Sequence, residues 1–426
     1  MGSEKRFFLS LDNAAKIYPA VRTKKWSNIF RLSVTLTEPI DPKLLQSALN
    51  VTVKRFPSVA MGLRRGFFWY RLEEIDKAPQ VIPDGPYPCS GMTRAEVRKC
   101  AFRVLYKGNR IAVEFFHVLT DGNGGLIFLK TLTAEYLSQK NGVKIPFEMG
   151  VYDRAEEPKE SEFEDSFLKN NGAVSKSRRE KDSYRLHGTG TDGFLYLTTG
   201  IVNLEEVLNV SKQHHVTLTV LLVSAMIYSV MKIQDGETTL KRRQKPVKVL
   251  IPVNLRNYFD SNSMRNFVLY ITPGIEANTG EFTFDEIVQL IHHQMKLQLT
   301  EKQMRMRITA NVKAEKNYFI KKLPLFIKNI GLKIIYASVG ERKSCLTLSN
   351  LGAVSIPEQM ESFVERFDFN LGVQLKSVNN CGILSYKNHM YINMIRSIEE
   401  PKLEDSFFSV LADMGIGVTV EKNRKE

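Results

Sequence analysis

The amino-acid sequence predicts a mixed α/β protein built from two layered subdomains. Strand-like and helix-like patterns alternate in both halves of the chain, and a polar stretch separates the halves. That stretch, residues 153–192, has an acidic run followed by a basic run and few large apolar residues. With 426 residues, 43% hydrophobic and 25% charged, the chain is long enough for two domains of average size. We therefore expect a subdomain over residues 1–152, a linker over 153–192 and a second subdomain over 193–426.

The first subdomain shows clear start and turn signals. Asp41-Pro42 offers a helix cap and a first-turn proline, so a helix is expected over Lys43–Phe56. The turn Lys107-Gly108-Asn109 lies between segments rich in β-branched and aromatic residues, which is typical of a hairpin. A glycine-rich loop at 121–125 then opens a helix with one apolar face. The expected strand and hairpin segments are Ser27–Thr37, Ser58–Glu73, Glu96–Tyr106 and Arg110–Phe116.

The second subdomain begins around the longest apolar stretch, Val216–Met231. Serines and threonines interrupt this stretch, and it is shorter than the roughly 20 residues of a membrane span, so it indicates a buried helix. Other helices are expected over Leu204–His214, Phe284–Leu299 and Glu404–Met414, and a turn is expected at Asn379-Asn380. The expected strands are Phe194–Val202, Val247–Val253, Cys345–Ser349, Phe363–Phe369, Val373–Val378, Gly382–Tyr386 and Met390–Ile395.

The charge of the chain restricts its partners. A formal net charge of +14 favours an anionic partner: nucleic acid, an anionic membrane surface, an acidic carrier protein or a phosphorylated cofactor. Nucleic acid is disfavoured, because no helix-turn-helix, zinc-finger or aromatic RNA-binding pattern accompanies the basic residues. The four cysteines are widely separated and have no histidine at metal-ligand spacing, which indicates neither a disulfide framework nor a metal site. Together with a polar start that lacks the pattern of a secretory signal, this favours a cytoplasmic location.

The most informative segment is Phe115–Gly125, which contains the pattern H-x-x-x-D-G where a strand meets the start of a helix. Acyl transfer from a thioester to a hydroxyl needs a base that takes the hydroxyl proton, and neutral imidazole has a suitable pKa, so His117 is the candidate base. Asp121 can hold the loop in place by pairing with a cation. Gly122 and the glycines after it leave room for a substrate or a backbone and permit positive φ. Alternatively, His117 merely ends a strand and a turn follows.

With these segments in view, the chain resembles, nearly end to end, the superfamily typified by chloramphenicol acetyltransferase. This superfamily includes condensation domains of peptide synthetases, polyketide-associated acyltransferases and alcohol acetyltransferases. Besides H-x-x-x-D-G, the resemblance rests on Leu9–Pro19 (LSLDNAAKIYP), Ile251–Arg256 (IPVNLR) and Leu346–Gly352 (LTLSNLG), in matching order. The first and last of these look most like bacterial alcohol acetyltransferases. Phe116 stands where many condensation domains have a second histidine, and Asp368–Gly372 only faintly echoes the Asp-Phe-Gly-Trp-Gly segment of plant acyltransferases, so both of those groups are disfavoured.

The resemblance implies two subdomains arranged as a V around a central channel. His117 would lie at its centre, with donor and acceptor entering from opposite ends. It also implies a salt bridge between Asp121 and an arginine of the second subdomain; Arg256 is the candidate, unless it is simply a solvated arginine after a strand. Ser349 and Asn350 are candidate donors to the oxyanion of the tetrahedral intermediate, or alternatively only turn the chain.

Two basic segments suggest ligand contacts. Lys241-Arg242-Arg243 could hold the phosphates of coenzyme A, or form a solvated loop. The stretch Lys321–Tyr336 mixes apolar residues with lysines as an interfacial helix does, although Pro324 interrupts it. Packing onto the core is the default interpretation of this stretch; with a lipid acceptor, it would instead form a peripheral membrane contact.

The sequence therefore predicts an O-acyltransferase that moves an acyl group from acetyl-CoA, or another acyl-CoA, to the hydroxyl of a small molecule or lipid. The expected mechanism is direct attack in a ternary complex, without a metal and without an acyl-enzyme, since no activated Ser or Cys nucleophile is evident. Two alternatives remain. One is a condensation-type acyltransferase that uses a thioester on an acidic carrier protein, and the other is an inactive relative that binds an acyl ligand.

Overall fold

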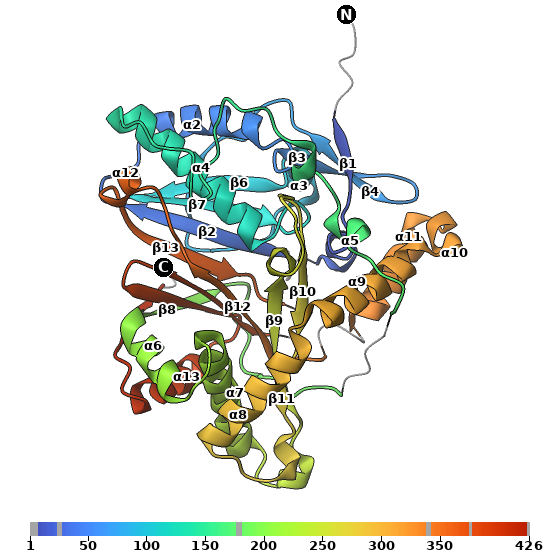
Figure 1. The fold of residues 1–426 in the computed structure, drawn as a ribbon, viewed down its shortest axis with the longest axis vertical. Helices are drawn as coiled ribbons and strands as arrows, with labels where there is room; N and C mark the ends of the chain where they lie inside the picture. Colours follow the sequence, from blue (N-terminus) through green and yellow to red (C-terminus); the bar gives the residue numbers. More distant parts are fainter. Residues whose placement is uncertain (1–6, 24–27, 176–180, 338–341, 375–376, 424–426) are drawn as a thin grey trace, which may run out of the picture.

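Two large β-sheets, each covered by helices, form the body of the protein (Figure 1). The computed structural model describes residues 7–23, 28–175, 181–337, 342–374 and 377–423. The mixed α/β class predicted from the sequence is confirmed.

The first sheet contains four strands from the first half of the chain and one from the second half. They are β2 (Ile29–Leu36), β5 (Ile82–Pro83), β6 (Phe102–Lys107), β7 (Arg110–Phe116) and β13 (Val364–Leu371). Their order is β13-β2-β7-β6-β5. The predicted hairpin is present, since β6 and β7 pair antiparallel across a turn in which Gly108 has a φ of 57°.

Two helices, α2 (Pro42–Arg55) and α4 (Gly122–Asn141), pack together over the first sheet in the upper part of Figure 1. The Asp41 carboxylate caps α2 by accepting a hydrogen bond from the Lys43 amide (2.8 Å), as the sequence predicts. Beneath α4, the ring of Phe128 lies 5.7 Å from that of Phe115, within the first hydrophobic core. The core and the caps together fix where α4 begins, which matters for the site below.

A small sheet lies at one end of the first subdomain, in the order β1-β4-β3. The helix α3 (Arg94–Lys99) packs beside it, so the strand expected over Glu96–Tyr106 is wrong for its first part. Thr93 and Glu96 form a capping box, in which each side chain accepts a hydrogen bond from the other residue's amide, and this starts a helix. The strands are β1 (Phe8–Ser10), β3 (Met61–Arg65) and β4 (Tyr70–Glu74), and the short helix α1 (Tyr18–Val21) follows β1.

Among the described residues the second sheet has eight strands, all from the expected second subdomain, residues 193–426. They are β8 (Tyr196–Asn203), β9 (Val247–Asn254), β10 (Val268–Ile271), β11 (Gly274–Ile275), β12 (Leu346–Ala353), β14 (Asn379–Tyr386), β15 (His389–Arg396) and β16 (Val418–Lys422). The order is β10-β9-β12-β14-β15-β8-β16, with β11 beside β9. Strand β12 runs parallel to both β9 and β14, and the other pairs are antiparallel.

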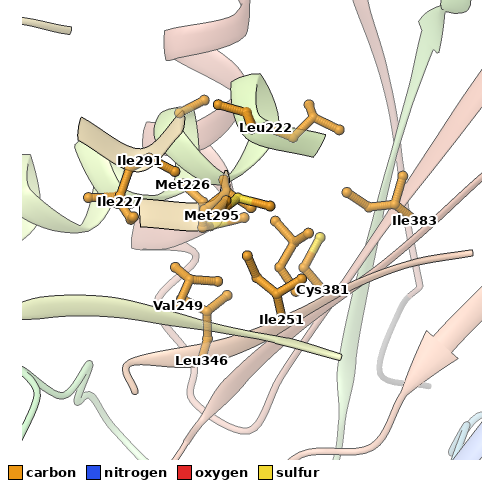
Figure 2. Packing of buried hydrophobic residues seen from close by; sticks show 14 of the residues in the cluster. Leu222, Met226, Ile227, Val249, Ile251, Ile291, Met295, Leu346, Cys381 and Ile383 are labelled. Carbon is orange, nitrogen blue, oxygen red and sulfur yellow. The ribbon is translucent and has the colours of Figure 1, made fainter. Parts of the chain in front are cut away.

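The helix α7 (Leu218–Glu237) is the centre of the second core. Figure 2 shows Met226 of α7 and Met295 of α8 (Phe284–Gln298) above the strand residues Ile251 and Cys381. Among the described residues α7 is the one helix long and apolar enough to cross a membrane, but 67% of its most apolar window is buried inside the protein. The prediction of a buried helix is therefore confirmed. The other helices near this sheet are α6 (Leu204–Gln213) and α13 (Lys402–Asp413).

Strand β13 joins the two halves. It pairs antiparallel with β2, so that Phe369 lies opposite Leu32, although it was assigned by sequence to the subdomain 193–426. A strand from residues 193–426 therefore completes the sheet formed mainly by residues 1–152. The expected subdomain boundaries did not include this strand exchange.

The turn expected at Asn379-Asn380 is wrong, because both residues belong to β14 and pair with Arg396 and Ile395 of β15. The Asn380 side chain accepts a hydrogen bond from the Thr347 amide (2.9 Å) and so binds a neighbouring strand rather than its own turn. The strand expected just before it, Val373–Val378, is wrong in its described part, because residues 373–374 and 377–378 belong to no strand. Residues 375–376 lie outside the described residues.

The expected linker contains the short helices η1 (Glu160–Glu162) and α5 (Ser166–Lys169). Glu162 accepts two hydrogen bonds, of 2.7 and 2.8 Å, from the buried guanidinium of Arg55, so this segment is fastened to α2. Most of its basic run, residues 176–180, lies outside the described residues.

An arm of three helices extends to one edge of the molecule, at the right of Figure 1. It consists of α9 (Glu301–Lys316), α10 (Tyr318–Lys322) and α11 (Leu325–Ile335). Pro324 separates α10 from α11, as a proline within a helical pattern predicts. The remaining short elements are η2 (Lys241–Arg243), η3 (Leu255–Asn257), η4 (Ala277–Thr279) and α12 (Glu358–Glu361).

Candidate active site

His117 follows β7 directly and lies just before the start of α4. Its amide donates a hydrogen bond to the Asn28 carbonyl (2.9 Å), which extends the pairing of β7 with β2 by one residue. Asp121 then caps α4 through its side chain. The motif therefore lies at a strand-to-helix junction, as the sequence predicts, and His117 is half-buried there.

Aromatic rings enclose the imidazole of His117. The ring of Tyr18 stacks on it with centroids 4.7 Å apart, and the ring of Phe30 meets it at an angle of 61° and a distance of 5.0 Å. Burial lowers the pKa of His117 below its ordinary value of 6.5, and this effect exceeds the opposing influence of Asp121 and Asn266. The imidazole is therefore neutral at neutral pH, the form that can accept a proton.

Asn266 determines which ring nitrogen of His117 carries the proton. Its amide nitrogen donates to a carboxylate oxygen of Asp12 (3.2 Å) and to the backbone carbonyl of His117 (3.0 Å). Its side-chain oxygen is thereby turned toward His117 Nδ1, at 2.9 Å, and an amide oxygen only accepts. Nδ1 consequently carries the hydrogen, and Nε2 keeps the lone pair that a general base needs.

Asp12 anchors this arrangement from the other side. It is fully buried and accepts a hydrogen bond from the Ala15 amide (2.8 Å), while Arg265 Nε lies 3.9 Å from its carboxylate. Burial raises the pKa of Asp12, and Arg265 opposes that rise. Sequence reasoning assigned no role to Asp12 or Asn266. For Asp12 the available signal was its place inside the segment Leu9–Pro19; Asn266 lies outside every quoted segment.

Asp121 faces away from the imidazole proton and organises the loop instead. Its carboxylate accepts hydrogen bonds from Arg256 Nη1 (2.7 Å), from the Phe267 amide (2.9 Å) and from the Gly124 amide (3.1 Å). Asp121 is 1% exposed, so these contacts replace all of its hydration. The ion pair with Arg256 that the resemblance implies is present in the structure.

Arg256 ties two loops together. Besides Asp121, it donates to the backbone carbonyls of Ser263 (2.7 Å) and Arg265 (2.6 Å). Those carbonyls belong to the segment that carries Asn266. The ion pair therefore positions both the start of α4 and the residue that orients the imidazole.

The glycines of the motif allow close approach. A Cβ atom on Gly124 would lie 2.2 Å from Thr120 Oγ1 and 2.6 Å from the Met264 carbonyl oxygen, and one on Gly122 would lie 2.7 Å from a methyl group of Leu351. The freedom of these glycines to adopt positive φ is not used, because they form the first turn of α4 in ordinary helical conformation.

The contact between Gly122 and Leu351 brings β12, which carries the two oxyanion candidates, to the start of α4. Ser349 pairs with Gly382, and a Cβ atom on Gly382 would meet the Phe369 carbonyl of β13. Because paired residues of neighbouring strands project their side chains to the same face of the sheet, Ser349 faces the first sheet. Asn350 is already engaged: its amide nitrogen lies 3.3 Å from Thr219 Oγ1, and its oxygen accepts from the Gly352 amide (2.8 Å).

Lys241, Arg242 and Arg243 are not brought to this centre. They precede β9, whereas Arg256 follows it, and the eight residues of β9 span about 23 Å. Lys241 Nζ is bound to Asp235 at 2.7 Å. Their assignment to the phosphates of coenzyme A stays a prediction.

The thiols are not suited to nucleophilic catalysis. Burial raises the pKa of Cys100 to about 12 and that of Cys345 to about 11, so both remain protonated at neutral pH. Within the described part of the chain, no group of three or more His, Cys, Asp or Glu side chains could hold a metal ion.

Comparisons with known proteins show the fold. No protein-family model matches the chain, and no curated protein sequence matches it. Among solved structures, TRI101 of Fusarium sporotrichioides, complexed with coenzyme A and T-2, is similar with a TM-score of 0.63 and 12% identity, over 97% of this chain and 99% of that chain.

Two bacterial structures are also similar. Polyketide synthase associated protein 5 of Mycobacterium tuberculosis matches with a TM-score of 0.59 and 13% identity, over 95% of this chain and 96% of that chain. The wax ester synthase/diacylglycerol acyltransferase of Marinobacter aquaeolei matches with a TM-score of 0.55 and 13% identity, over 96% of this chain and 100% of that chain. The protein thus has the two-lobed fold of chloramphenicol acetyltransferase-like and condensation-type proteins, as the sequence predicts.

Proposed function

We propose that the protein is an O-acyltransferase that transfers an acyl group from an acyl-CoA, acetyl-CoA first among them, to the hydroxyl of an alcohol-type acceptor. The observation that carries the proposal is the imidazole of His117, which is neutral and has its proton held on Nδ1 by Asn266. A base in this state accepts a proton through Nε2.

In the proposed reaction, the acceptor oxygen attacks the thioester carbonyl carbon while Nε2 of His117 takes the hydroxyl proton. The new C–O bond gives a tetrahedral oxyanion. When the C–S bond breaks, the imidazolium returns the proton to the departing sulfur, so the products are an ester and free coenzyme A thiol. Direct transfer agrees with the raised pKa values of all four thiols, since no cysteine is prepared to form an acyl-enzyme.

For the oxyanion we propose Ser349 rather than Asn350 as the donor. One N–H and the oxygen of the Asn350 side chain are engaged by Thr219 and Gly352, which fix its orientation, whereas Ser349 faces the first sheet. A single positioned donor of this kind contributes about 10²-fold or more to the rate.

Alcohol-type acceptors are supported by the segments Leu9–Pro19 and Leu346–Gly352, which look most like bacterial alcohol acetyltransferases. The presence of coenzyme A in the similar Fusarium structure supports a coenzyme A donor. The identity of the acceptor within this class is open to a direct screen.

The test is release of free thiol from acetyl-CoA and longer acyl-CoAs, across a panel of alcohols, amines and glycolipids. Wild type is compared with His117→Ala and with His293→Ala, an exposed histidine on α8 that serves as matched control. We expect release that requires an acceptor, falls by about 10²–10⁴-fold in His117→Ala and is unchanged in the control. Equal release by wild type and His117→Ala would refute the role of His117.

The net charge of +14 supports a second candidate donor, an acyl group carried on an acidic carrier protein. The same assay distinguishes the two. If every acyl-CoA fails and an acyl carrier protein supports turnover, the donor assignment changes while the role of His117 stands.

A further inference from the structure

The helix α11 has the opposite polarity to an ordinary surface helix. Phe326, Ile330 and Ile334 are exposed by 58, 58 and 64%, and they lie on one face because they are spaced four residues apart. Ile327 extends the same face and is 39% exposed. The default interpretation, that this stretch packs its apolar residues onto the core, is therefore wrong.

The opposite face of α11 fixes this orientation. Lys328 is only 5% exposed; its ammonium group donates to the Phe68 carbonyl (3.0 Å) and lies 3.9 Å from the centre of the Trp69 ring. Leu325 is buried, and its amide donates to the Phe67 carbonyl (2.9 Å). A cation held inward and several large apolar side chains held outward are not explained by the stability of the chain alone.

The apolar surface continues onto the turn between β3 and β4. Phe67 and Phe68 in this turn are 72 and 47% exposed, and the hydrogen bond to Leu325 places the turn beside the start of α11. In Figure 1 β4, α10 and α11 all lie at the right-hand side of the molecule. The α11 patch is defined by Phe67, Phe68, Phe326, Ile327, Ile330 and Ile334.

The charges around the α11 patch have one sign. Residues 313–333 contain six lysines and a single acidic residue, Glu315. Glu315 is engaged, because it pairs with Lys16 and accepts a hydrogen bond from Asn13 (2.8 Å). Five of the six lysines are exposed, and in the sequence they lie before or among the apolar residues of α11: Lys313, Lys316, Lys321, Lys322 and Lys333. Aromatic and branched aliphatic side chains with a cationic rim complement an anionic lipid surface, where lysines meet phosphates and the apolar side chains enter the acyl-chain boundary.

The α11 patch is connected to the catalytic centre. Helix α11 packs against α1, and α1 carries Tyr18, whose ring stacks on the imidazole of His117. A membrane bound at the patch would therefore contact a helix that itself packs on the element covering the base.

We propose that the α11 patch docks the protein on the surface of an anionic lipid bilayer. From that position the site takes a hydroxyl acceptor that resides in the bilayer, a long-chain alcohol or a lipid hydroxyl. The docking part of the proposal depends only on the properties of the α11 patch. The delivery of the acceptor also depends on the proposed acyltransferase function.

Sedimentation of the full chain with lipid vesicles tests the docking. The anionic vesicles are phosphatidylcholine with about one third phosphatidylglycerol, used at about 0.1 M and about 0.5 M salt. Pure phosphatidylcholine vesicles are the uncharged comparison. The patch variant is Phe326→Glu/Ile330→Glu. The matched control is Leu290→Glu/Leu297→Glu, two residues of α8 that are 41 and 73% exposed. On anionic vesicles, we expect the partition coefficient of the patch variant to be at least tenfold lower than that of wild type, and that of the control to lie within twofold of wild type. We also expect wild type to bind pure phosphatidylcholine vesicles at least tenfold more weakly than anionic vesicles.

Absence of wild-type binding to anionic vesicles at low salt, or equal binding by the patch variant, would overturn the proposal. A wild-type dimer in solution that the patch variant converts to monomer would overturn it as well, since a second copy would then cover the patch. Thiol release with a water-soluble alcohol is measured in parallel. Loss of vesicle binding with unchanged release assigns the patch to docking. Absence of release with every donor and every acceptor of the panel, water-soluble or presented in vesicles, would refute the proposed function, and intact vesicle binding would leave the docking standing.

Discussion

The candidate catalytic centre around His117 and the α11 patch arrange polar and apolar groups in opposite ways. In the centre, the charged and amide groups of Asp12, Asp121 and Asn266 are buried, and each is satisfied by named partners. In the patch, large apolar side chains such as Ile334 are exposed, while Lys328 is held inside. Buried polar groups cost folding free energy unless hydrogen bonds compensate, as they do within the centre, whereas exposed apolar side chains forgo the stabilisation that burial would give. Polar groups held inside and apolar groups held outside both depart from the usual pattern, and such departures are guides to function in both regions.

The largest expected effect is loss of the buried ion pair. Asp121→Ala leaves the Arg256 guanidinium, whose side chain is only 11% exposed, without its counter-charge, so we expect the free energy of unfolding to fall by about 3–5 kcal/mol. Urea denaturation of the purified variant measures it. The exposed pair of Lys181 and Glu276 is the matched control, since Glu276→Ala should cost less than about 1 kcal/mol. Similar losses in both variants would show that Asp121 does not organise the centre.

Removing the side chain that orients the base should affect the rate more than the fold. Asn266→Ala frees the imidazole to place its proton on either nitrogen, so we expect kcat to fall by about 10–10²-fold. Nitrogen-15 NMR of the labelled imidazole provides the independent measurement. In wild type Nδ1 of His117 should show the shift of a protonated nitrogen, and in the variant the two nitrogens should become more alike. A lower kcat with an unchanged spectrum would contradict the positioning role.

Filling the space at the start of α4 should have a smaller effect. A methyl group on Gly124 meets Thr120 and the Met264 carbonyl, so Gly124→Ala should destabilise the protein by about 1–3 kcal/mol. Gly236, near the end of α7, has no atom within 4 Å of its would-be Cβ, and Gly236→Ala should be neutral or slightly stabilising. If the two alanine variants have equal thermal midpoints, the close approach at Gly124 has been overestimated.

The smallest effect is expected at the α11 patch when no lipid is present. Because Phe326 and Ile330 contribute little buried area, Phe326→Glu/Ile330→Glu should change the free energy of unfolding by no more than about 0.5 kcal/mol per site. Urea denaturation without vesicles tests this. A loss of several kcal/mol would mean that the patch is part of the core and would remove the contrast between the two regions.

The sequence predicted the parts of the centre that lie in contiguous motifs. The H-x-x-x-D-G pattern located His117 and Asp121 at a strand-to-helix junction, and the segment Ile251–Arg256 supplied the partner of Asp121. Asp12 and Asn266 were missed because their contact joins residues 254 positions apart, and no local periodicity encodes such a distance.

The orientation of α11 was missed for a different reason. Hydrophobic periodicity shows that a helix has an apolar face, but not whether that face meets the core or the outside. Here the Trp69 ring and the carbonyl of Phe68 bind Lys328 and turn the apolar face outward. The turn predicted at Asn379-Asn380 failed similarly, since the partners of Asn380 lie on other strands.

The central claim is that neutral His117 accepts the acceptor's proton, and the pH dependence of kcat/KM for acceptor-dependent thiol release tests it most directly. Because burial lowers the pKa of His117 below 6.5, the base stays neutral into mildly acidic solution. We predict that kcat/KM is constant above about pH 7 and falls about tenfold per pH unit below an apparent pKa lower than 6.5. Activity that rises as the pH falls, or the same profile in His117→Ala, would contradict the account.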